Sequence, residues 1–348
     1  MLSTAIVKDE RYLRHSTGEY HPENHHRLEA IYEMLDEEGM KGKFREVVPR
    51  PATREELEMV HTSRYVDQVA ATYGRDYTML DPDTSTSAES WEVARLAAGG
   101  LLNLVDGVVQ GDFKNGFALV RPPGHHAETN RAMGFCIFNN VAIAAKYARQ
   151  KYNLEKILIV DWDLHHGNGT QNAFYEDHHV LYFSTHQFPY YPGSGSIGEI
   201  GRGIGTGFTV NVPLPGGQGD AEYVQIFREL LCPIAEEYAP QLVLVSAGFD
   251  IYFQDPLGAM NVTPGGFYLL TAIMMEIAQK CCQDRVLMVL EGGYNLTGLR
   301  ESVKASLKRL GGMEYKGLPG SEKRKEMTGT KEIINPVKTV QKKLWKLL

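Results

Sequence analysis

The sequence predicts an α/β protein built as a three-layer sandwich, with an open, mainly parallel sheet between two layers of helices. Short apolar segments rich in β-branched residues alternate along the chain with longer segments of helical periodicity. Two of the short segments, residues 157–160 and 242–245, are apolar at every position. Strands buried on both faces of a parallel sheet have this composition. These observations together favour βαβ units over an all-β or all-α fold.

The elements follow one another in a regular order. Strands are expected at residues 4–7, 116–120, 156–160, 180–183, 241–245 and 286–290, with a further apolar run at 208–212 after a long glycine-rich loop at 193–207. Helices that cover the sheet are expected at residues 89–109, 139–150, 222–237 and 266–280. No internal repeat and no linker rich in Pro, Gly and Ser divides the chain. We therefore expect one catalytic domain over residues 1–312. A basic extension over residues 313–348 is expected to be helical and to pack on that domain.

Composition limits the classes of protein that fit. The chain has 348 residues, of which 43% are hydrophobic, and 36 Lys plus Arg against 43 Asp plus Glu give a net charge of −7. This charge argues against direct nucleic-acid binding. No apolar run is long enough to cross a membrane, no export signal precedes Lys8, and the four cysteines lack a CxxC spacing. We expect a soluble, cytoplasmic protein that does not bind membranes, and the sequence leaves its oligomeric state open.

Polar clusters directly follow four of the expected strands. They lie at residues 122–126, 161–166, 248–250 and 291–294. In open α/β sheets, ligands bind at the carboxyl ends of the strands. Four segments that are distant in sequence are therefore expected to meet at one site.

Asp163, His165 and Asp250 are the candidate metal ligands in these clusters. Asp163 and His165 are separated by one residue, so their side chains lie on the same face of an extended segment. Two carboxylates and one imidazole leave coordination positions open, as in a catalytic zinc site that keeps a water. An isolated Asp-x-His is more often a surface turn, but the convergence of three strand ends favours a metal site.

Other residues of the clusters suit proton transfer. His125 or His126 can take a proton from a water beside the metal, and Asp161 can accept a hydrogen bond from one of these imidazoles. Tyr294, which follows two glycines, can donate a hydrogen bond to a carbonyl oxygen that becomes negative. The alternatives are a polar loop for the histidines, a satisfied buried carboxylate for Asp161 and a core tyrosine for Tyr294.

Five motifs identify a family. They are Arg-Pro-Pro-Gly-His-His-Ala-Glu at 121–128, Gly-Phe-Cys-Ile-Phe-Asn-Asn at 134–140, Asp-Trp-Asp-Leu-His-His-Gly-Asn-Gly-Thr at 161–170, Ser-Ala-Gly-Phe-Asp at 246–250 and Glu-Gly-Gly-Tyr at 291–294. In this order, across about residues 9–312, they resemble the histone deacetylase family in its class II-like and prokaryotic branch. The resemblance implies the arginase/deacetylase fold and hydrolysis of an acetylated amine.

The resemblance also implies a role for each matching position. Zinc, with iron as an alternative, would be held by Asp163, His165 and Asp250. His126 would be the main general base and acid, with His125 and Asp161 as its electrostatic partners, and Tyr294 would polarise the amide carbonyl. Asn168 stands where class I members have an aspartate, and its neutrality should leave a cationic His126 less stabilised.

Further positions match the substrate channel and a second ion site. Phe135 and Tyr191 would line the channel for the acyl-lysine stem, Arg27 would lie beneath the site, and Asp83 would hold substrate backbone at the rim. Tyr191 stands where phenylalanine is usual. Ser184 and Thr185, with the backbone carbonyls of Asp161, Asp163 and His165, match a structural site for a monovalent cation, usually potassium.

Several functions compete. An arginase-like enzyme needs a second metal, for which no motif is present, and a catalytically silent binding protein would have lost a catalytic group, whereas His125, His126 and Tyr294 are all present. Among active enzymes, an acyl-lysine peptide competes with acetylpolyamines or other small acetylated amines as substrate. Some polyamine deacetylases have an acidic gate where this chain has the apolar Leu257, which favours acyl-lysine.

Overall fold

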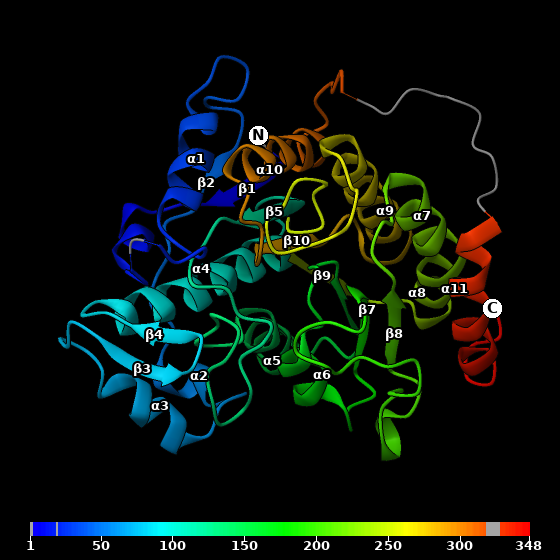
Figure 1. Ribbon diagram of the computed structural model, residues 1–348, viewed down its shortest axis with the longest axis horizontal. Helices are drawn as coiled ribbons and strands as arrows, with labels where there is room; N and C mark the ends of the chain where they lie inside the picture. Colours follow the sequence, from blue (N-terminus) through cyan, green and yellow to red (C-terminus); the bar gives the residue numbers. More distant parts are fainter. Residues whose placement is uncertain (1–2, 19, 318–327) are drawn as a thin grey trace.

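In the computed structural model, which describes residues 3–18, 20–317 and 328–348, the centre of the protein is an eight-stranded sheet (Figure 1). Its strands, in their order across the sheet, are β2 (Arg45–Glu46), β1 (Thr4–Val7), β5 (Asn115–Ala118), β10 (Val286–Leu290), β9 (Leu242–Ala247), β6 (Ile157–Asp161), β7 (Val180–Gln187) and β8 (Thr209–Leu214). Every neighbouring pair is parallel. The expected α/β sandwich is therefore confirmed, and this sheet is wholly parallel.

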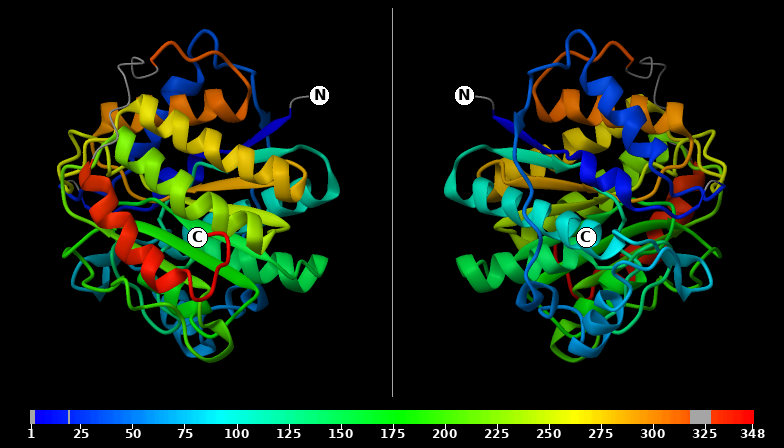
Figure 2. Two further views of the ribbon diagram at one scale, coloured as in Figure 1. Left: turned by 90° about the vertical axis from the view of Figure 1, so that its right-hand side faces the viewer. Right: turned by 90° about the vertical axis from the view of Figure 1, so that its left-hand side faces the viewer.

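Helices cover both faces of the sheet, which lies between them in Figure 2. One layer contains α4 (Ser90–Gln110), α5 (Asn140–Tyr152) and α6 (Asn168–Phe174). The other contains α1 (His26–Leu35), α7 (Asp220–Ile226), α8 (Cys232–Tyr238), α9 (Pro264–Cys282), α10 (Leu296–Leu310) and α11 (Thr328–Gln341). Of the helices in the described ranges, none has the length and apolar character needed to cross a membrane.

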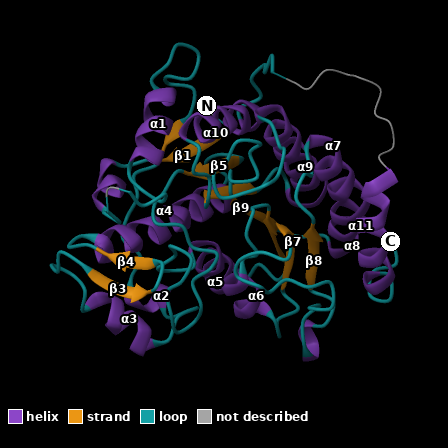
Figure 3. Cartoon of the chain, viewed as in Figure 1, coloured by secondary structure: helices purple, strands orange, loops and turns teal. Residues whose placement is uncertain are grey.

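A small peripheral unit lies beside the main sheet. It consists of α2 (Arg54–Leu57), α3 (Ser63–Ala70) and the antiparallel pair β3 (Thr78–Asp81) and β4 (Thr84–Thr86), seen apart from the main sheet in Figure 3. The Thr53 and Thr62 side chains cap α2 and α3 by accepting hydrogen bonds from backbone amides of the first turn. Asp83 lies in the turn between β3 and β4 of this unit.

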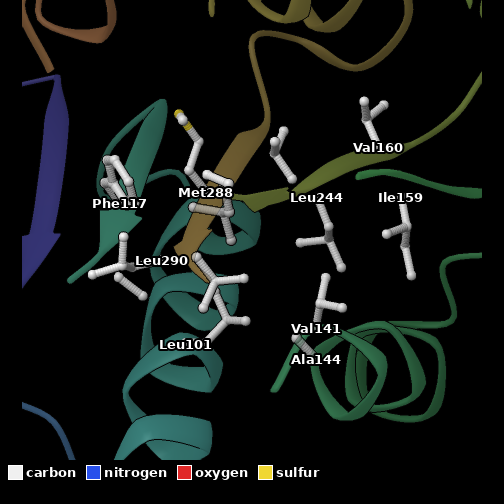
Figure 4. Packing of buried hydrophobic residues seen from close by; sticks show 14 of the residues in the cluster. Leu101, Phe117, Val141, Ala144, Ile159, Val160, Leu244, Met288 and Leu290 are labelled. Atoms are coloured by element: carbon white, nitrogen blue, oxygen red, sulfur yellow. The ribbon is translucent and has the colours of Figure 1, made fainter. Parts of the chain in front are cut away.

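Apolar side chains fill the space between the sheet and its helices. Figure 4 shows Leu101 of α4 and Val141 of α5 turned toward strands that carry Leu244, Ile159 and Leu290. All five side chains are at most 1% exposed. Strands in a sheet covered on both sides have apolar side chains at successive positions, which explains the unbroken apolar runs in the sequence.

The expected strands all occur, and two differences are informative. β7 continues to Gln187 instead of ending at residue 183, because His186 and Gln187 still pair with β8. β2 was not expected from the sequence. It is a two-residue edge strand with exposed Arg45 and Glu46, so it has no apolar pattern.

The helix expected over residues 222–237 is present, but it is not regular. α7 and α8 are joined by a π-helical turn, Phe227–Leu231, so the chain is helical without interruption from 220 to 238. Pro233 has no amide hydrogen to donate, and its ring would clash with the carbonyl of Glu229 in a regular helix. The wider turn before it accommodates the proline.

The C-terminal helix packs on the edge of the sheet. α11 contacts β8 and α7, and Ile334, Val337 and Trp345 are buried. The Trp345 Nε1 donates a hydrogen bond to the carbonyl oxygen of Gly207 at 3.1 Å. Residues 318–327 of the expected extension lie outside the described residues, and the domain boundary at residue 312 stays a prediction.

The contact between α4 and residues 50–52 generates a stability prediction. A Cβ at Gly99 would lie 1.9 Å from the carbonyl oxygen of Arg50 and 2.7 Å from the amide nitrogen of Ala52, so backbone would have to move. We expect Gly99→Ala to lower the free energy of unfolding by about 1–3 kcal/mol, as overpacking typically does. The control is Gly329→Ala in α11, where a Cβ would meet no atom of the described residues within 4 Å and alanine favours the helix. Thermal melting of both variants checks this, and an unchanged Tm for Gly99→Ala would contradict the packing described.

Candidate active site

The polar clusters follow the carboxyl ends of four strands that are adjacent in the sheet, β5, β10, β9 and β6. Their register places Val289 beside both Ala118 and Ser246, and Ser246 beside Asp161. These strands therefore end at nearly the same level. The loops that follow them begin side by side, although they are far apart in sequence.

Asp163, His165 and Asp250 form one group at this edge. Nδ1 of His165 lies 3.2 Å from Oδ1 of Asp163 and 3.2 Å from Oδ2 of Asp250. One potential ligand atom from each residue lies within 4.8 Å of the others, and both carboxylates are buried. Two carboxylate oxygens and an imidazole nitrogen within this span are a suitable donor set for a divalent first-row metal.

The charges of this group also fit a resident cation. Burial raises the pKa of Asp250 to about 7, and the nearby charge of Asp163 contributes to the shift. Burial alone would lower the pKa of His165, but Asp163 and Asp250 outweigh it and raise that pKa to about 9. Buried carboxylates this close need a positive partner, and a divalent cation would neutralise both.

Backbone amides and glycines hold the two carboxylates in place. The Leu164 amide donates to Oδ1 of Asp250 at 2.9 Å, and the Gly292 amide donates to Oδ2 of Asp163 at 2.8 Å. A Cβ at Gly248 would lie 2.1 Å from Oδ2 of Asp163, and one at Gly292 would lie 2.3 Å from Oδ2 of Asp250. Only glycine allows the backbone to come this close.

His125 and Asp161 form a buried charged pair. The His125 Nδ1 donates to Oδ2 of Asp161 at 3.1 Å, and the Tyr182 hydroxyl donates to the same oxygen at 3.0 Å. Burial alone would lower the pKa of His125, but Asp163 and Asp161 outweigh it and raise that pKa to about 10. The first histidine is therefore the cationic member of the pair.

His126 lies next to this pair and differs from it in charge. Its Nδ1 donates to Oδ1 of Asn168 at 2.7 Å, and its ring centroid is 4.0 Å from that of His125. Burial lowers the pKa of His126 well below its usual value, and the positive charges of His125 and His165 lower it further. A neutral imidazole with its proton on Nδ1 has Nε2 free to act as a base.

Tyr294 projects from the turn after β10. Its ring makes an edge contact with Phe135 at 5.9 Å between centroids, and the Arg27 guanidinium lies 5.0 Å from the ring centroid. Burial raises the pKa of the Tyr294 phenol well above its usual value, with smaller contributions from Asp250 and Asp163. The hydroxyl therefore keeps its proton near neutral pH and can donate a hydrogen bond.

Arg27 is fully buried, and its guanidinium packs against the Tyr294 ring. Its Nε donates to the carbonyl oxygen of Gly293 at 2.7 Å, its Nη2 to that of Glu291 at 2.5 Å, and its Nη1 to Oε1 of Glu23 at 3.0 Å. Two of these acceptors belong to the backbone turn that carries the tyrosine. Arg27 thus fixes the turn rather than pointing into the open site.

Phe135 and Tyr191 contact different residues of the site. The Tyr191 ring contacts those of His126 and His165 edge-on, at 5.2 and 6.0 Å between centroids, while Phe135 contacts Tyr294. Tyr191 is 38% exposed, so this wall reaches the surface. The structure therefore brings both predicted channel residues to the site.

Asp83 and Leu257 lie at the rim. Oδ1 of Asp83 accepts a hydrogen bond from the Gly134 amide at 2.9 Å, which links the peripheral strand pair to the loop that carries Phe135. The carbonyl oxygen of Leu257 accepts from the Tyr190 hydroxyl at 2.9 Å. Tyr190 also stacks on His165, with ring centroids 5.7 Å apart. Sequence reasoning missed Tyr190, for which its position beside Tyr191 was the available signal.

Ser184 and Thr185 lie on β7, the neighbour of strand β6, after which Asp163 and His165 follow. Ser184 pairs with Asp161 across the sheet, and its hydroxyl is 2.9 Å from Nδ1 of His186. The Thr185 hydroxyl is buried and has no hydrogen-bond partner among the residues that the structure describes. The structure thus places Ser184 beside Asp161, and the monovalent-cation site stays a prediction.

Glu291 was missed as a site residue, although it begins a motif that the sequence displays. Its Oε2 accepts from the amides of Gly124 and His125 at 2.6 and 3.2 Å, and its Oε1 accepts from the Ser246 hydroxyl at 3.1 Å. This carboxylate ties the histidine loop to the strands that carry Asp250 and Tyr294. The available signal in the sequence was a glutamate directly after an expected strand and before a glycine pair.

Comparison with known proteins gives the family. A profile of the histone deacetylase domain matches residues 21–310. Histone deacetylase 15 of Arabidopsis thaliana is 44% identical over 88% of this chain and 56% of its own length, and histone deacetylase 9 of Homo sapiens is 39% identical over 91% and 34%. The chain thus spans about half the length of the Arabidopsis relative and about a third of the length of the human one.

Two further matches cover nearly whole proteins or domains. A probable deacetylase of Archaeoglobus fulgidus is 41% identical over 85% of this chain and 82% of its own length. The crystal structure of the HDA15 HD domain superposes with a TM-score of 0.92 at 41% identity, covering 99% of this chain and 95% of that one. With the same fold and a match over most of its length, the chain belongs to the histone deacetylase family.

Proposed function

We propose that the protein is a metal-dependent amidohydrolase that removes an acetyl or other short acyl group from an acylated amine, with N-ε-acyl-lysine as the preferred substrate. The observation that carries this proposal is the arrangement of His126 beside the group of Asp163, His165 and Asp250. A base, a candidate metal site with two carboxylates and a protonated phenol at the same edge of the sheet are the parts that amide hydrolysis requires.

Asp163, His165 and Asp250 would hold the metal, which we propose is Zn²⁺ with Fe²⁺ as the alternative. A bound ion would act as a Lewis acid toward the amide carbonyl and lower the pKa of a water. Ser184 and Thr185, with nearby backbone carbonyls, would hold K⁺ as a structural ion. These assignments follow from the donor atoms and from the family.

The protein's own groups would carry the protons. His126 would take a proton from the attacking water through Nε2, because its Nδ1 is engaged by Asn168. It would then give that proton to the departing amine. His125, which is cationic beside Asp161, would stabilise the negative charge that develops during the reaction. The Tyr294 hydroxyl would donate a hydrogen bond to the carbonyl oxygen as that oxygen becomes an anion.

The rim supports an acyl-lysine substrate. Phe135 and Tyr191 would offer aromatic walls for an extended aliphatic stem, and Asp83 would accept hydrogen bonds from substrate backbone. Leu257 lies half-buried near Tyr190 and offers no charge to a second amine. A polycationic substrate would gain little from an apolar side chain there, so we rank acetylpolyamines below acyl-lysine.

A substrate panel tests the proposed function. We expect an acetyl-lysine peptide to be hydrolysed with kcat/KM at least about 10-fold above that for an acetylated polyamine, because the apolar Leu257 gives the second amine no partner. Release of acetate from each substrate by the full chain with Zn²⁺ or Fe²⁺ supplied is the measurement. A preference for the polyamine would reverse the substrate assignment. No turnover on any substrate would favour the catalytically silent alternative.

Tyr294→Phe separates a catalytic tyrosine from a structural one. The variant loses only the hydroxyl, whose hydrogen bond strengthens as the carbonyl oxygen becomes negative, so we expect kcat to fall by on the order of 10²-fold or more with little change in KM. The matched control is Tyr147→Phe, which removes a buried hydroxyl that donates to Asp106 on α4. It should retain kcat. Steady-state kinetics and melting curves of both variants decide, and an unaltered kcat for Tyr294→Phe would remove that residue from the mechanism.

A further inference from the structure

We propose that Glu128 is a positioning residue for the hydrolysis: its carboxylate fixes which end of the Asn168 amide faces His126, and this sets the tautomer of that histidine. The inference rests on the proposed function, because it concerns the base of that reaction. Glu128 contacts Asn168, which in turn contacts His126, so it would act through Asn168.

The two ends of the Asn168 amide meet different partners. Its Oδ1 lies 2.7 Å from Nδ1 of His126. Its Nδ2 donates to Oε1 of Glu128 at 2.6 Å, and it also lies 3.2 Å from Sδ of Met133 and 3.4 Å from the carbonyl oxygen of His126. All three neighbours of Nδ2 are acceptors, and the carboxylate is the closest and the only charged one of these three.

The chemistry of an amide makes this arrangement decisive. An amide has an acceptor at one end and donors at the other, so it can engage His126 in two opposite ways. In the observed orientation, Asn168 accepts the Nδ1 proton and leaves Nε2 of His126 unprotonated. In the flipped orientation, Nδ2 would donate to Nδ1, and the imidazole proton would move to Nε2, where the base is needed.

Glu128 opposes the flipped orientation. A flip would bring the amide oxygen to the place of Nδ2, which is 2.6 Å from a carboxylate oxygen, so two acceptors would repel each other. An aspartate at position 168 would present acceptors at both ends and would need no such guide. Because Asn168 is an amide, a neighbouring acceptor is needed to keep its Nδ2 away from His126 and its Oδ1 toward that histidine.

The carboxylate is itself held firmly. Asn172 donates through Nδ2 to both oxygens of Glu128, at 2.9 and 3.0 Å. The Glu128 backbone donates to the carbonyl oxygen of Arg131 at 3.0 Å and accepts from Nδ1 of His61 at 2.9 Å. Its side chain is only 12% exposed, so solvent screens its charge weakly.

Two substitutions at Glu128 test the role of the acceptor. Glu128→Ala should lower kcat on the order of 10-fold with KM within about 2-fold and with unchanged metal content, because lost outer partners of site residues typically cost about 10- to 100-fold in activity. Glu128→Gln should retain most of kcat, since its amide oxygen can still accept from Asn168. Asn172→Ala should lower kcat less than Glu128→Ala, because it removes a partner of the Glu128 carboxylate but leaves that carboxylate to accept from Asn168. The control is Glu58→Ala, which removes a carboxylate that accepts from Arg54 on the peripheral unit and should retain kcat. Equal losses in Glu58→Ala and Glu128→Ala would reject the positioning role.

The decisive measurement is a double-mutant cycle with Asn168→Asp. A carboxylate at position 168 has no orientation to fix, so Glu128→Ala should not lower kcat further in that background, and relief of charge repulsion should raise it. A loss of about 10-fold in both backgrounds would show that Glu128 acts only on local structure, and the inference would fail. So would a wild-type kcat for Glu128→Ala alone. If the unaltered protein hydrolyses no substrate of the panel, it is the proposed function that fails.

Discussion

The carboxylates of Asp163 and Asp250 are buried next to each other at the carboxyl edge of the sheet, and the surrounding structure is adapted to this costly arrangement. Backbone amides of Leu164 and Gly292 donate to them, and glycines allow the chain to approach them closely. Nδ1 of His165 lies 3.2 Å from one oxygen of each carboxylate. A parallel sheet makes the arrangement possible, because β6 and β9 end at the same level and deliver both carboxylates to one point.

A second group of buried charges supports the loops that carry the proposed catalytic groups. Glu23 accepts from Arg121 at 2.8 Å and from Arg27 at 3.0 Å, and all three side chains are fully buried. Burial alone would raise the pKa of Glu23, but the two arginines outweigh it and lower that pKa to about 2, so the network stays charged over the pH range in which the protein would work. Arg27 then holds the turn that carries Tyr294, and Glu291 holds the loop that carries His125. Together these contacts connect the N-terminal segment to the residues proposed to be catalytic.

The sequence allowed the sheet and most of the candidate site to be predicted, because apolar runs mark buried strands and the polar clusters follow them directly. It did not reveal the edge strand β2, whose Arg45 and Glu46 have no apolar pattern. It also did not reveal the pairing of Glu23 with Arg121, which are 98 positions apart, nor the contact of Tyr190 with His165. Such contacts depend on how distant loops fold over the site, and no local periodicity or motif spacing encodes them.

The central claim is that one divalent cation neutralises the buried group of Asp163, His165 and Asp250. The most direct measurement is the content of zinc and iron in the purified full chain, determined by mass spectrometry of the metal and compared with the Asp250→Ala variant. We expect close to one equivalent of Zn²⁺ or Fe²⁺ per chain in the unaltered protein and far less in the variant. Two equivalents, or the same content in both proteins, would contradict the account.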